Sequence, residues 1–163
     1  MSGLPPEDKV LTRAALVERY GRPRDLDIVF TNGCFDLLHR GHVAYLNAAR
    51  RLGDVLVVGV NADVSARRLG KGDDRPLVPE ADRAYLVAAL ECVDIVSIFD
   101  EDTPRELIAA LLPDVLVKGG DYTPETVVGR AEVEATGGRV VLIPFVEGYS
   151  TTRLLHRIRE LES

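Results

Sequence analysis

Residues 28–42 read IVFTNGCFDLLHRGH, a stretch in which a short apolar run passes through a glycine turn into a helical pattern. The run Ile28–Phe30 is typical of a buried strand, and the apolar spacing over 43–52 is typical of an amphipathic helix. Free backbone N–H groups and the helix dipole meet at such a turn, where they favour a bound anion. Because His39 and His42 lie at this point, the pattern indicates chemistry on a phosphate.

Short runs rich in Val and Ile recur along the chain, and each is apolar on both faces, as strands buried in a parallel sheet are. We predict strands at Asp27–Phe30, Val55–Val60, Val93–Ile98, Val115–Val117 and Val140–Ile143. Helical patterns alternate with them at Gly41–Leu52, Ala62–Leu69, Glu80–Glu91, Pro104–Leu112, Pro124–Ala135 and Ser150–Leu161. The alternation predicts an α/β fold, a Rossmann-like, doubly wound five-stranded parallel sheet with helices on both faces.

The length of 163 residues suits one domain with its own core, so we expect a single domain over 1–163. Residues 1–25 form its N-terminal part, with an extra helix at Glu7–Tyr20 and a linker at Gly21–Asp25. Ligands of such sheets bind beyond the carboxyl ends of the strands, near the change in strand order. The loop at Asn32–His42 should therefore border the ligand crevice.

Net charge and composition limit the classes of molecule that we expect the protein to bind and the compartment in which we expect it. The net charge of -6 argues against a nucleic-acid partner, because such a partner calls for a basic excess. No stretch is long enough to span a membrane, and no signal peptide is recognisable at the N-terminus. Cys34 and Cys92 form no metal or redox spacing and are more typical of small apolar fillers, so we expect a cytoplasmic location.

Two common nucleotide motifs are missing from the sequence. Gly70-Lys71-Gly72 lacks the upstream glycine and the Ser/Thr of a P-loop, and no G-x-G-x-x-G follows the first strand. The histidines carry more weight, since two of only three in the chain flank Gly41. Each imidazole can donate a hydrogen bond to a phosphoryl group during its transfer. Because glycine has no side chain, a ligand can also approach the backbone closely at this position. The alternative is a pair of surface histidines at a helix start.

Three further segments carry candidate binding groups. Ser150 is expected to cap the last helix, and with Thr151 and Thr152 it could cradle phosphate; an N-cap alone is the simpler interpretation. Residues 117–122, VKGGDY, could present backbone groups to a nucleobase, or form an ordinary glycine turn. In the charged segment 67–83, Lys71 and Arg83 could contact a polyphosphate, although charge runs are usually solvated surface.

Five segments in this order resemble the H-x-G-H nucleotidyltransferase superfamily, and within it the family of D-glycero-β-D-manno-heptose 1-phosphate adenylyltransferases. They are Thr31–His42 (TNGCFDLLHRGH), Val60–Asp63 (VNAD), Arg75–Arg83 (RPLVPEADR), Val117–Tyr122 (VKGGDY) and Gly137–Arg153 (GGRVVLIPFVEGYSTTR). The resemblance implies transfer of AMP from ATP to a sugar 1-phosphate, with release of pyrophosphate. It also implies a homodimer.

The resemblance also implies roles for single residues. The catalytic residues would be His39, His42, Lys71 and Arg83. The nucleotide would contact Thr31, Asn32, Gly33, Cys34, Phe35, Gly41, Lys118, Gly119, Asp121, Tyr122, Ser150, Thr151 and Thr152. The sugar phosphate would contact Asp36 and Asp63.

The chemistry is consistent with these roles. A sugar phosphate is already an anionic nucleophile, so positioning and charge neutralisation can suffice without a strong base. The sequence has no acidic cluster for a protein metal cage, so we expect Mg²⁺ to be held mainly by the ATP phosphates. Two alternatives stay open: a cytidylyltransferase or FAD synthetase-like enzyme, and a nucleotide-binding module without catalysis.

Overall fold

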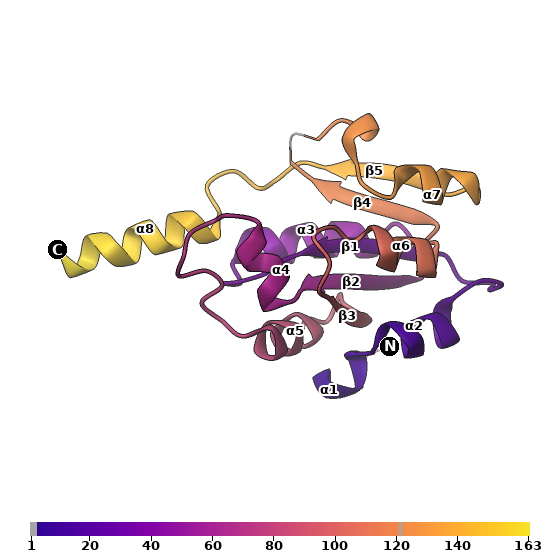
Figure 1. Cartoon of the computed structure of the whole chain (residues 1–163), viewed down its shortest axis with the longest axis horizontal. Coiled ribbons are helices and arrows are strands. Elements are labelled where there is room, and N and C mark those ends of the chain that lie inside the picture. The colour runs from indigo at the N-terminus through magenta and orange to yellow at the C-terminus, as the bar shows by residue number, and fades with distance from the viewer. Residues whose placement is uncertain (1–2, 121) are drawn as a thin grey trace.

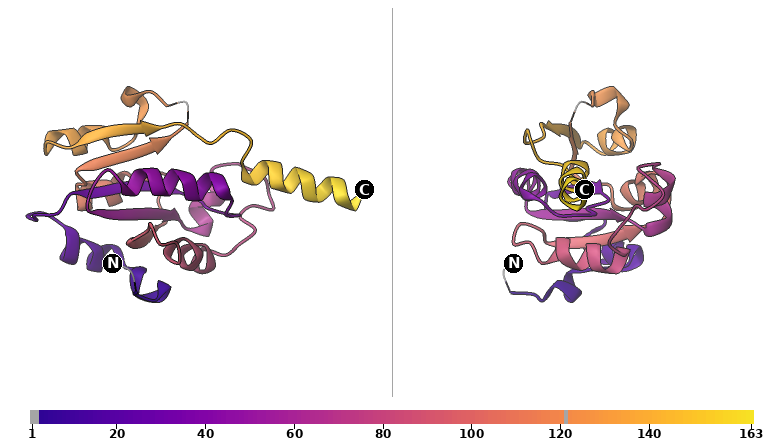
Figure 2. Two further views of the ribbon diagram at one scale, coloured as in Figure 1. Left: turned by 180° about the vertical axis from the view of Figure 1, so that it is seen from behind. Right: turned by 90° about the vertical axis from the view of Figure 1, so that its left-hand side faces the viewer.

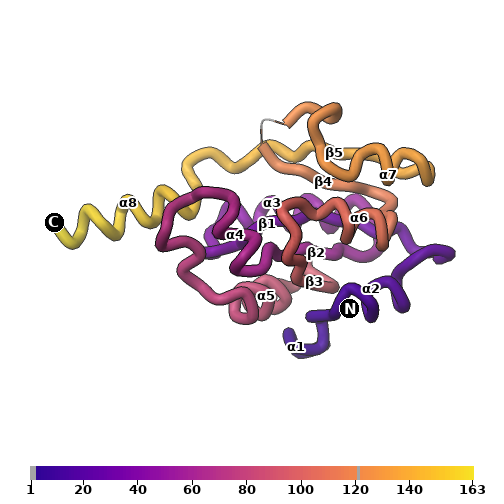
Figure 3. Tube along the Cα trace, viewed as in Figure 1, coloured from indigo at the N-terminus to yellow at the C-terminus, as the bar shows by residue number. Residues whose placement is uncertain are grey.

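The computed structural model describes residues 3–120 and 122–163, and its chain path is traced in Figure 3. The strands are β1 (Ile28–Gly33), β2 (Val55–Asn61), β3 (Ile95–Phe99), β4 (Val115–Gly119) and β5 (Arg139–Ile143). The helices are α1 (Pro6–Lys9), α2 (Arg13–Tyr20), α3 (Arg40–Arg50), α4 (Asp63–Arg68), α5 (Glu80–Ala88), α6 (Arg105–Leu111), the 3₁₀ helix η1 (Pro124–Thr126), α7 (Arg130–Ala135) and α8 (Thr151–Glu162).

The five strands form one parallel sheet in the order β3-β2-β1-β4-β5 (Figure 1). This arrangement confirms the predicted Rossmann-like α/β fold. The chain first moves outward from β1 to β2 and β3, and then returns to place β4 on the other side of β1. The strand order therefore changes at β1, and a ligand crevice is expected beyond its carboxyl end.

Side chains alternate between two hydrophobic clusters, one on each face of the sheet. Val29 packs with Leu46 of α3 and Val87 of α5, whereas Phe30 packs with residues of α2, α6 and α7, such as Leu107. The view from behind in Figure 2 shows α3 lying along its face of the sheet. Both faces of β1 to β4 are thus largely buried, which explains why the sequences of these strands are mostly apolar rather than alternating.

The predicted N-terminal helix at Glu7–Tyr20 is wrong as a single element. The helix is interrupted between α1 and α2, where Val10 forms a parallel bridge with Val96 of β3. Thr12 then starts α2 by accepting a hydrogen bond from the Ala15 N–H at 3.2 Å. Helical periodicity could not reveal the break, because it depends on pairing with a residue far along the chain.

The predicted helix at Pro124–Ala135 is also divided, into η1 and α7. Gly129 has φ of 89°, a left-handed conformation that ends one segment and begins the next. A Cβ at this position would lie 2.7 Å from Ile108 Cδ1, so α6 packs directly on the glycine backbone. The other predicted helices are present with shifted ends; α5, for example, ends at Ala88 rather than Glu91.

Helix α8 projects away from the body of the molecule (Figures 1 and 2). None of its residues is buried, and its apolar side chains Leu154, Ile158 and Leu161 are 39%, 49% and 71% exposed. Its base is tied to the body by Thr151, whose hydroxyl donates to the Leu37 carbonyl at 3.1 Å. None of the helices in the described residues is both long and apolar enough to span a bilayer.

Candidate active site

Two adjoining cavities open at the carboxyl ends of the central strands. The larger, about 530 Å³, lies on the α3 side, between the start of α3 and the start of α8. The smaller, about 370 Å³, reaches towards the loop after β3 and η1. Six residues line both cavities: Asn32, Gly33, Cys34, Lys71, Lys118 and Tyr122. The end of β1 therefore forms a wall shared by the two spaces.

Most of the site residues predicted from the sequence meet in the larger cavity. Besides the six shared residues, it is lined by Phe35, His39, Gly41, His42, Gly119, Ser150, Thr151 and Thr152. These groups come from segments more than one hundred residues apart in the chain. Thr31 lies outside the cavity, because it is fully buried and its hydroxyl is 2.6 Å from the Tyr45 hydroxyl. The predicted contact at Asp121 falls outside the described residues.

His39 and His42 form a stacked pair at the N-terminus of α3. Their ring centroids are 3.8 Å apart, with an interplanar angle of 21°. His39 is the N-cap residue, and its backbone N–H points at Nδ1 of His42 over 3.4 Å. Because Nδ1 accepts this hydrogen bond, a neutral His42 carries its proton on Nε2. The Nδ1 atom of His39 is buried and has no partner among the described residues.

The surroundings keep His42 uncharged near neutral pH. Burial, with smaller contributions from the neighbouring charges of His39 and Lys71, lowers the pKa of His42 to about 4. Burial also lowers the pKa of His39 below its ordinary value. A neutral imidazole whose tautomer is fixed is a directed hydrogen-bond donor. It can therefore donate a hydrogen bond to a negatively charged phosphoryl oxygen without first losing or gaining a proton.

The lowered pKa of His42 predicts a pH dependence of stability. Well above pH 6.5 the side chain is neutral in both the folded and the unfolded state. As pH falls from 6.5 towards 4, the unfolded state takes up a proton that the folded state does not, so the free energy of unfolding decreases. We expect urea unfolding of wild type to lose stability more steeply over this range than His42→Gln. Equal slopes would contradict the buried neutral imidazole.

The side chains of His39 and Tyr149 lie so close to Gly41 that a larger residue would contact both of them. A Cβ at this position would lie 2.9 Å from Nδ1 and Cε1 of the His39 ring and 3.0 Å from the Tyr149 Cβ. We expect Gly41→Ala to displace the His39 ring and to lower turnover by roughly tenfold or more, since small misplacements are costly in catalysis. Helix content should be unchanged, because alanine favours helix. Wild-type kcat and KM in this variant would show that the ring position is unimportant.

Asp36 anchors a loop at the edge of the larger cavity, and its expected contact with the sugar phosphate stays a prediction. Its carboxylate accepts hydrogen bonds from Arg75 Nε at 2.8 Å, from the Leu77 N–H at 2.9 Å and from the Val78 N–H at 3.0 Å. Burial alone would raise the pKa of Asp36, but these donors hold it below its ordinary value. The carboxylate thus borders the larger cavity while its oxygens are committed to protein donors.

Arg83 and Asp63 pair with each other and line neither cavity, and their expected contacts with phosphate and sugar stay predictions. Arg83 is fully buried and donates to the carbonyls of Val78, Cys34 and Asn61 at 2.7–2.8 Å. Its remaining bond is to the Asp63 carboxylate at 2.7 Å. The guanidinium thereby joins the loops after β1 and β2 to the start of α5, and neither residue lines either cavity.

The start of α8 supplies hydroxyl and backbone N–H groups opposite the histidines. Ser150 caps the helix as predicted, because its Oγ accepts from the Arg153 N–H at 3.0 Å. The hydroxyl of Thr151 is bound to the Leu37 carbonyl, which fixes the helix start beside the loop after β1. Helix N-termini favour anions, so this side of the cavity suits a phosphate chain.

Aromatic residues complete the larger cavity, and no sequence pattern indicated them as part of the site. Tyr45 is spaced as a core residue of α3, and Phe145 follows β5 in an otherwise apolar segment. The Phe145 ring lies against the Gly119–Gly120 backbone, where a Cβ would come within 2.6 and 2.4 Å of the ring. Phe145 is nevertheless 68% exposed. Its free ring surface, beside the backbone of β4, suits a planar ligand group.

The family model for cytidylyltransferase-like proteins matches residues 30–157, from within β1 to within α8. The chain belongs to the cytidylyltransferase-like family. Among curated proteins, it is 58% identical to the D-beta-D-heptose 1-phosphate adenylyltransferase of Bordetella bronchiseptica, over 98% of this chain and 99% of that one. It is also 58% identical to the bifunctional protein HldE of Trichlorobacter lovleyi, over 94% of this chain.

The chain spans about a third of the length of the bifunctional proteins it matches, 32% for the Trichlorobacter one. Among solved structures, a lipopolysaccharide core biosynthesis protein from Thermoplasma volcanium is similar, with a TM-score of 0.63 and 28% identity. That match covers 77% of this chain and all of the other. The family match over residues 30–157 includes the loops that bear both cavities.

Proposed function

We propose that the protein is an adenylyltransferase that moves AMP from ATP to a sugar 1-phosphate of the D-glycero-β-D-manno-heptose type. The products are an ADP-sugar and pyrophosphate. One observation carries the proposal: the larger cavity joins the stacked His39 and His42, Lys71 and Lys118, and the N-terminus of α8. The Bordetella relative, which the chain matches over nearly its full length, is named for the same reaction and supports the proposal.

The residues of the larger cavity perform this reaction by binding and orienting. In the proposal, the start of α8 binds the outer phosphates, and the Nε2–H of His42 meets an oxygen of the α-phosphate. Lys71 and Lys118 line the shared wall and neutralise charge there; burial, together with the charge of Lys71, lowers the pKa of Lys118. The attacking oxygen of the sugar phosphate is already anionic, so no group has to remove a proton.

Mg²⁺ enters the proposal on the triphosphate, where it would neutralise charge and help the pyrophosphate leave. The side chains that border the cavity are consistent with a Mg²⁺ ion held mainly by the triphosphate. Among the described residues, Asp36 is the acidic side chain that borders the larger cavity, and its oxygens already accept hydrogen bonds from three protein donors. Within residues 3–120 and 122–163, no group of three or more His, Cys, Asp or Glu side chains is placed to hold a metal ion.

A nucleotide panel tests the proposal against its main rival. We expect pyrophosphate release with ATP, Mg²⁺ and D-glycero-β-D-manno-heptose 1-phosphate, and much slower release with CTP, GTP or UTP. A clear preference for CTP would establish the cytidylyltransferase alternative, which the family description makes the natural competitor. Tight ATP binding without pyrophosphate release for any sugar 1-phosphate would indicate a nucleotide-binding module.

The proposal includes a cytoplasmic homodimer. An ATP-consuming enzyme with the free cysteines Cys34 and Cys92 fits a reducing compartment. The exposed apolar side chains of α8 offer a surface that a second copy could cover. Sedimentation should show a dimer for wild type and a monomer, or a much weaker dimer, for Ile158→Asp. A wild-type monomer at micromolar concentration would remove this part of the proposal.

A further inference from the structure

The segment 70–74, which we call the lysine loop, carries Lys71 between two glycines. Gly70 has φ of 70° and Gly72 has φ of 130°, conformations that glycine adopts readily. A Cβ at Gly70 would meet no heavy atom of the described residues within 4 Å, and at Gly72 the nearest atom belongs to Asp74 of the same loop. Packing therefore does not fix the position of the Lys71 side chain, which lines both cavities.

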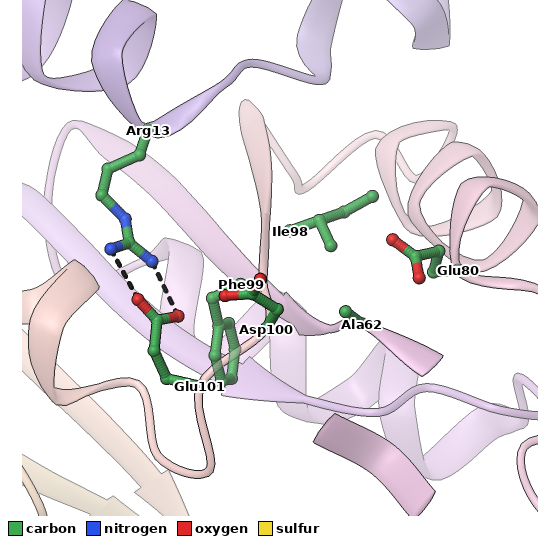
Figure 4. Close-up of a pocket in the computed structure, with 7 residues that line it drawn as sticks. All are labelled: Arg13, Ala62, Glu80, Ile98, Phe99, Asp100 and Glu101. Carbon is green, nitrogen blue, oxygen red and sulfur yellow. Dashed lines mark hydrogen bonds and ion pairs between the residues drawn. The ribbon is translucent and has the colours of Figure 1, made fainter. Parts of the chain in front are cut away.

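The start of the lysine loop is anchored to the loop after β3. Arg68, at the end of α4, pairs with Asp102 at 2.6 Å and donates a hydrogen bond to the Asp100 carbonyl. The loop after β3 is held in turn by α2, because Arg13 pairs with Glu101 at 2.6 Å (Figure 4). The chain that enters the lysine loop thus has a fixed position on the body of the molecule.

The end of the lysine loop has one contact with the body and one with α8. Arg75, the residue after the loop, is buried and pairs with Asp36 at 2.8 Å. Asp74 lies one residue earlier and pairs with Arg159 of α8 at 3.3 Å. In the part of the chain that the structure describes, this is the one ion pair between α8 and the rest of the molecule. The segment between α4 and α5 passes beside α8 here (Figures 1 and 2).

Helix α8 connects this ion pair to the ligand site. Residues 150–152, at its start, line the larger cavity opposite the two histidines. Arg159 lies roughly two turns further along, or about 12 Å at a rise of about 1.5 Å per residue. Because a hydrogen-bonded helix moves as one body, the ion pair links the position of the helix start to that of the lysine loop. The helix start and Lys71 both border the larger cavity.

We propose that Arg159 and Asp74 are positioning residues, whose ion pair holds the lysine loop so that Lys71 faces the bound triphosphate. This inference rests on the adenylyltransferase function proposed above, in which one nucleotide contacts both Lys71 and the start of α8. The two side chains are 64% and 60% exposed, so the pair should change an equilibrium by no more than about fivefold. A contact of this strength favours one loop position and still allows the loop to move during turnover.

Asp74→Asn distinguishes positioning from simple charge. The substitution removes a negative charge near a site for an anionic substrate, so charge alone predicts a higher kcat/KM for ATP. Loss of positioning predicts a fall of about two- to fivefold. Asp73→Asn is the matched control, because Asp73 is exposed in the same loop and has no ion pair among residues 3–120 and 122–163; its kcat/KM should equal or slightly exceed that of wild type. A rise with Asp74→Asn, or no difference from Asp73→Asn, would overturn the proposal.

A second comparison asks whether the effect passes through Lys71. In a protein that carries Lys71→Met, the loop no longer presents an ammonium group, so its position matters less. We expect Asp74→Asn to change kcat/KM by less than about 1.5-fold in that background, against about two- to fivefold with Lys71 present. The same fall in both backgrounds would show that Asp74 acts independently of Lys71 and would contradict the positioning role.

Trypsin cleavage after Lys71 reports the freedom of the loop without any turnover. Arg159→Gln leaves the sequence around Lys71 unchanged, and we expect cleavage there about two- to fivefold faster than in wild type. Arg157→Gln, which loses only the pair with Glu160 inside α8, should match wild type. Equal rates in all three proteins would overturn the link between α8 and the loop. If wild type forms no ADP-sugar although Arg159→Gln is cleaved faster, the proposed function fails while the link itself stands.

Discussion

Replacement of His42 by alanine is expected to lower kcat by about 100- to 1,000-fold, the usual cost of losing one preorganised donor to transition-state charge. The loss should fall mainly on kcat, since the imidazole is held ready by the His39 N–H and is neutral at pH 7. ATP binding should weaken much less. Stopped-flow or coupled pyrophosphate assays at saturating ATP and sugar phosphate measure this directly.

Two further variants at the same position identify the nitrogen that acts. The amide nitrogen of glutamine lies near the Nε2 position of histidine, whereas that of asparagine lies near Nδ1. Because Nδ1 of His42 already accepts the His39 N–H, we expect His42→Gln to retain clearly more activity than His42→Asn or His42→Ala. The reverse order would place the catalytic proton on Nδ1 and would contradict the assigned tautomer.

Replacement of Arg83 by methionine is expected to destabilise the fold by roughly 3–5 kcal/mol, because it leaves buried acceptors without their donor. Those acceptors are three carbonyls and the Asp63 carboxylate, and the Arg83 side chain is fully buried. This loss would be a large fraction of the stability of a small domain. Urea unfolding monitored by circular dichroism measures the change.

An exposed ion pair of the same length provides the control. Arg105 Nε lies 2.7 Å from the Glu132 carboxylate, but the Arg105 side chain is 63% exposed. Arg105→Met should therefore cost less than about 1 kcal/mol. If Arg83→Met unfolds at the wild-type urea concentration yet has lost turnover, the guanidinium acts on a ligand and the structural role assigned to it is incorrect.

The elements that determine the topology could be predicted from the sequence because they depend on local pattern. The apolar runs of β1 to β5 need only burial on both faces, and the loop at Asn32–His42 follows from its position after the first strand. The gathering of residues 32–42, 118–122 and 150–152 was predicted for a related reason. In a parallel sheet, all segments that follow carboxyl strand ends lie at the same edge.

The roles of Asp36 and Arg83 could not be predicted, because a charged side chain in a ligand loop looks the same whether its partner is a ligand or a protein group. Apart from Val78, which is 5 residues from Arg83, their partners lie 20 to 49 residues away in the chain, and only packing brings them together. Tyr45 was missed for the opposite reason: its spacing is that of the α3 core stripe, yet its ring also reaches the larger cavity.

Transfer of AMP to the sugar phosphate can be followed directly with D-glycero-β-D-manno-heptose 1-phosphate whose phosphate oxygens carry ¹⁸O. The label is followed by mass spectrometry after incubation with the wild-type protein, ATP and Mg²⁺. Attack by the sugar phosphate on the α-phosphorus of ATP predicts ADP-heptose that contains all of the label, together with an equal amount of unlabelled pyrophosphate. Absence of ADP-heptose, or label in the pyrophosphate, would contradict adenylyl transfer to the sugar phosphate.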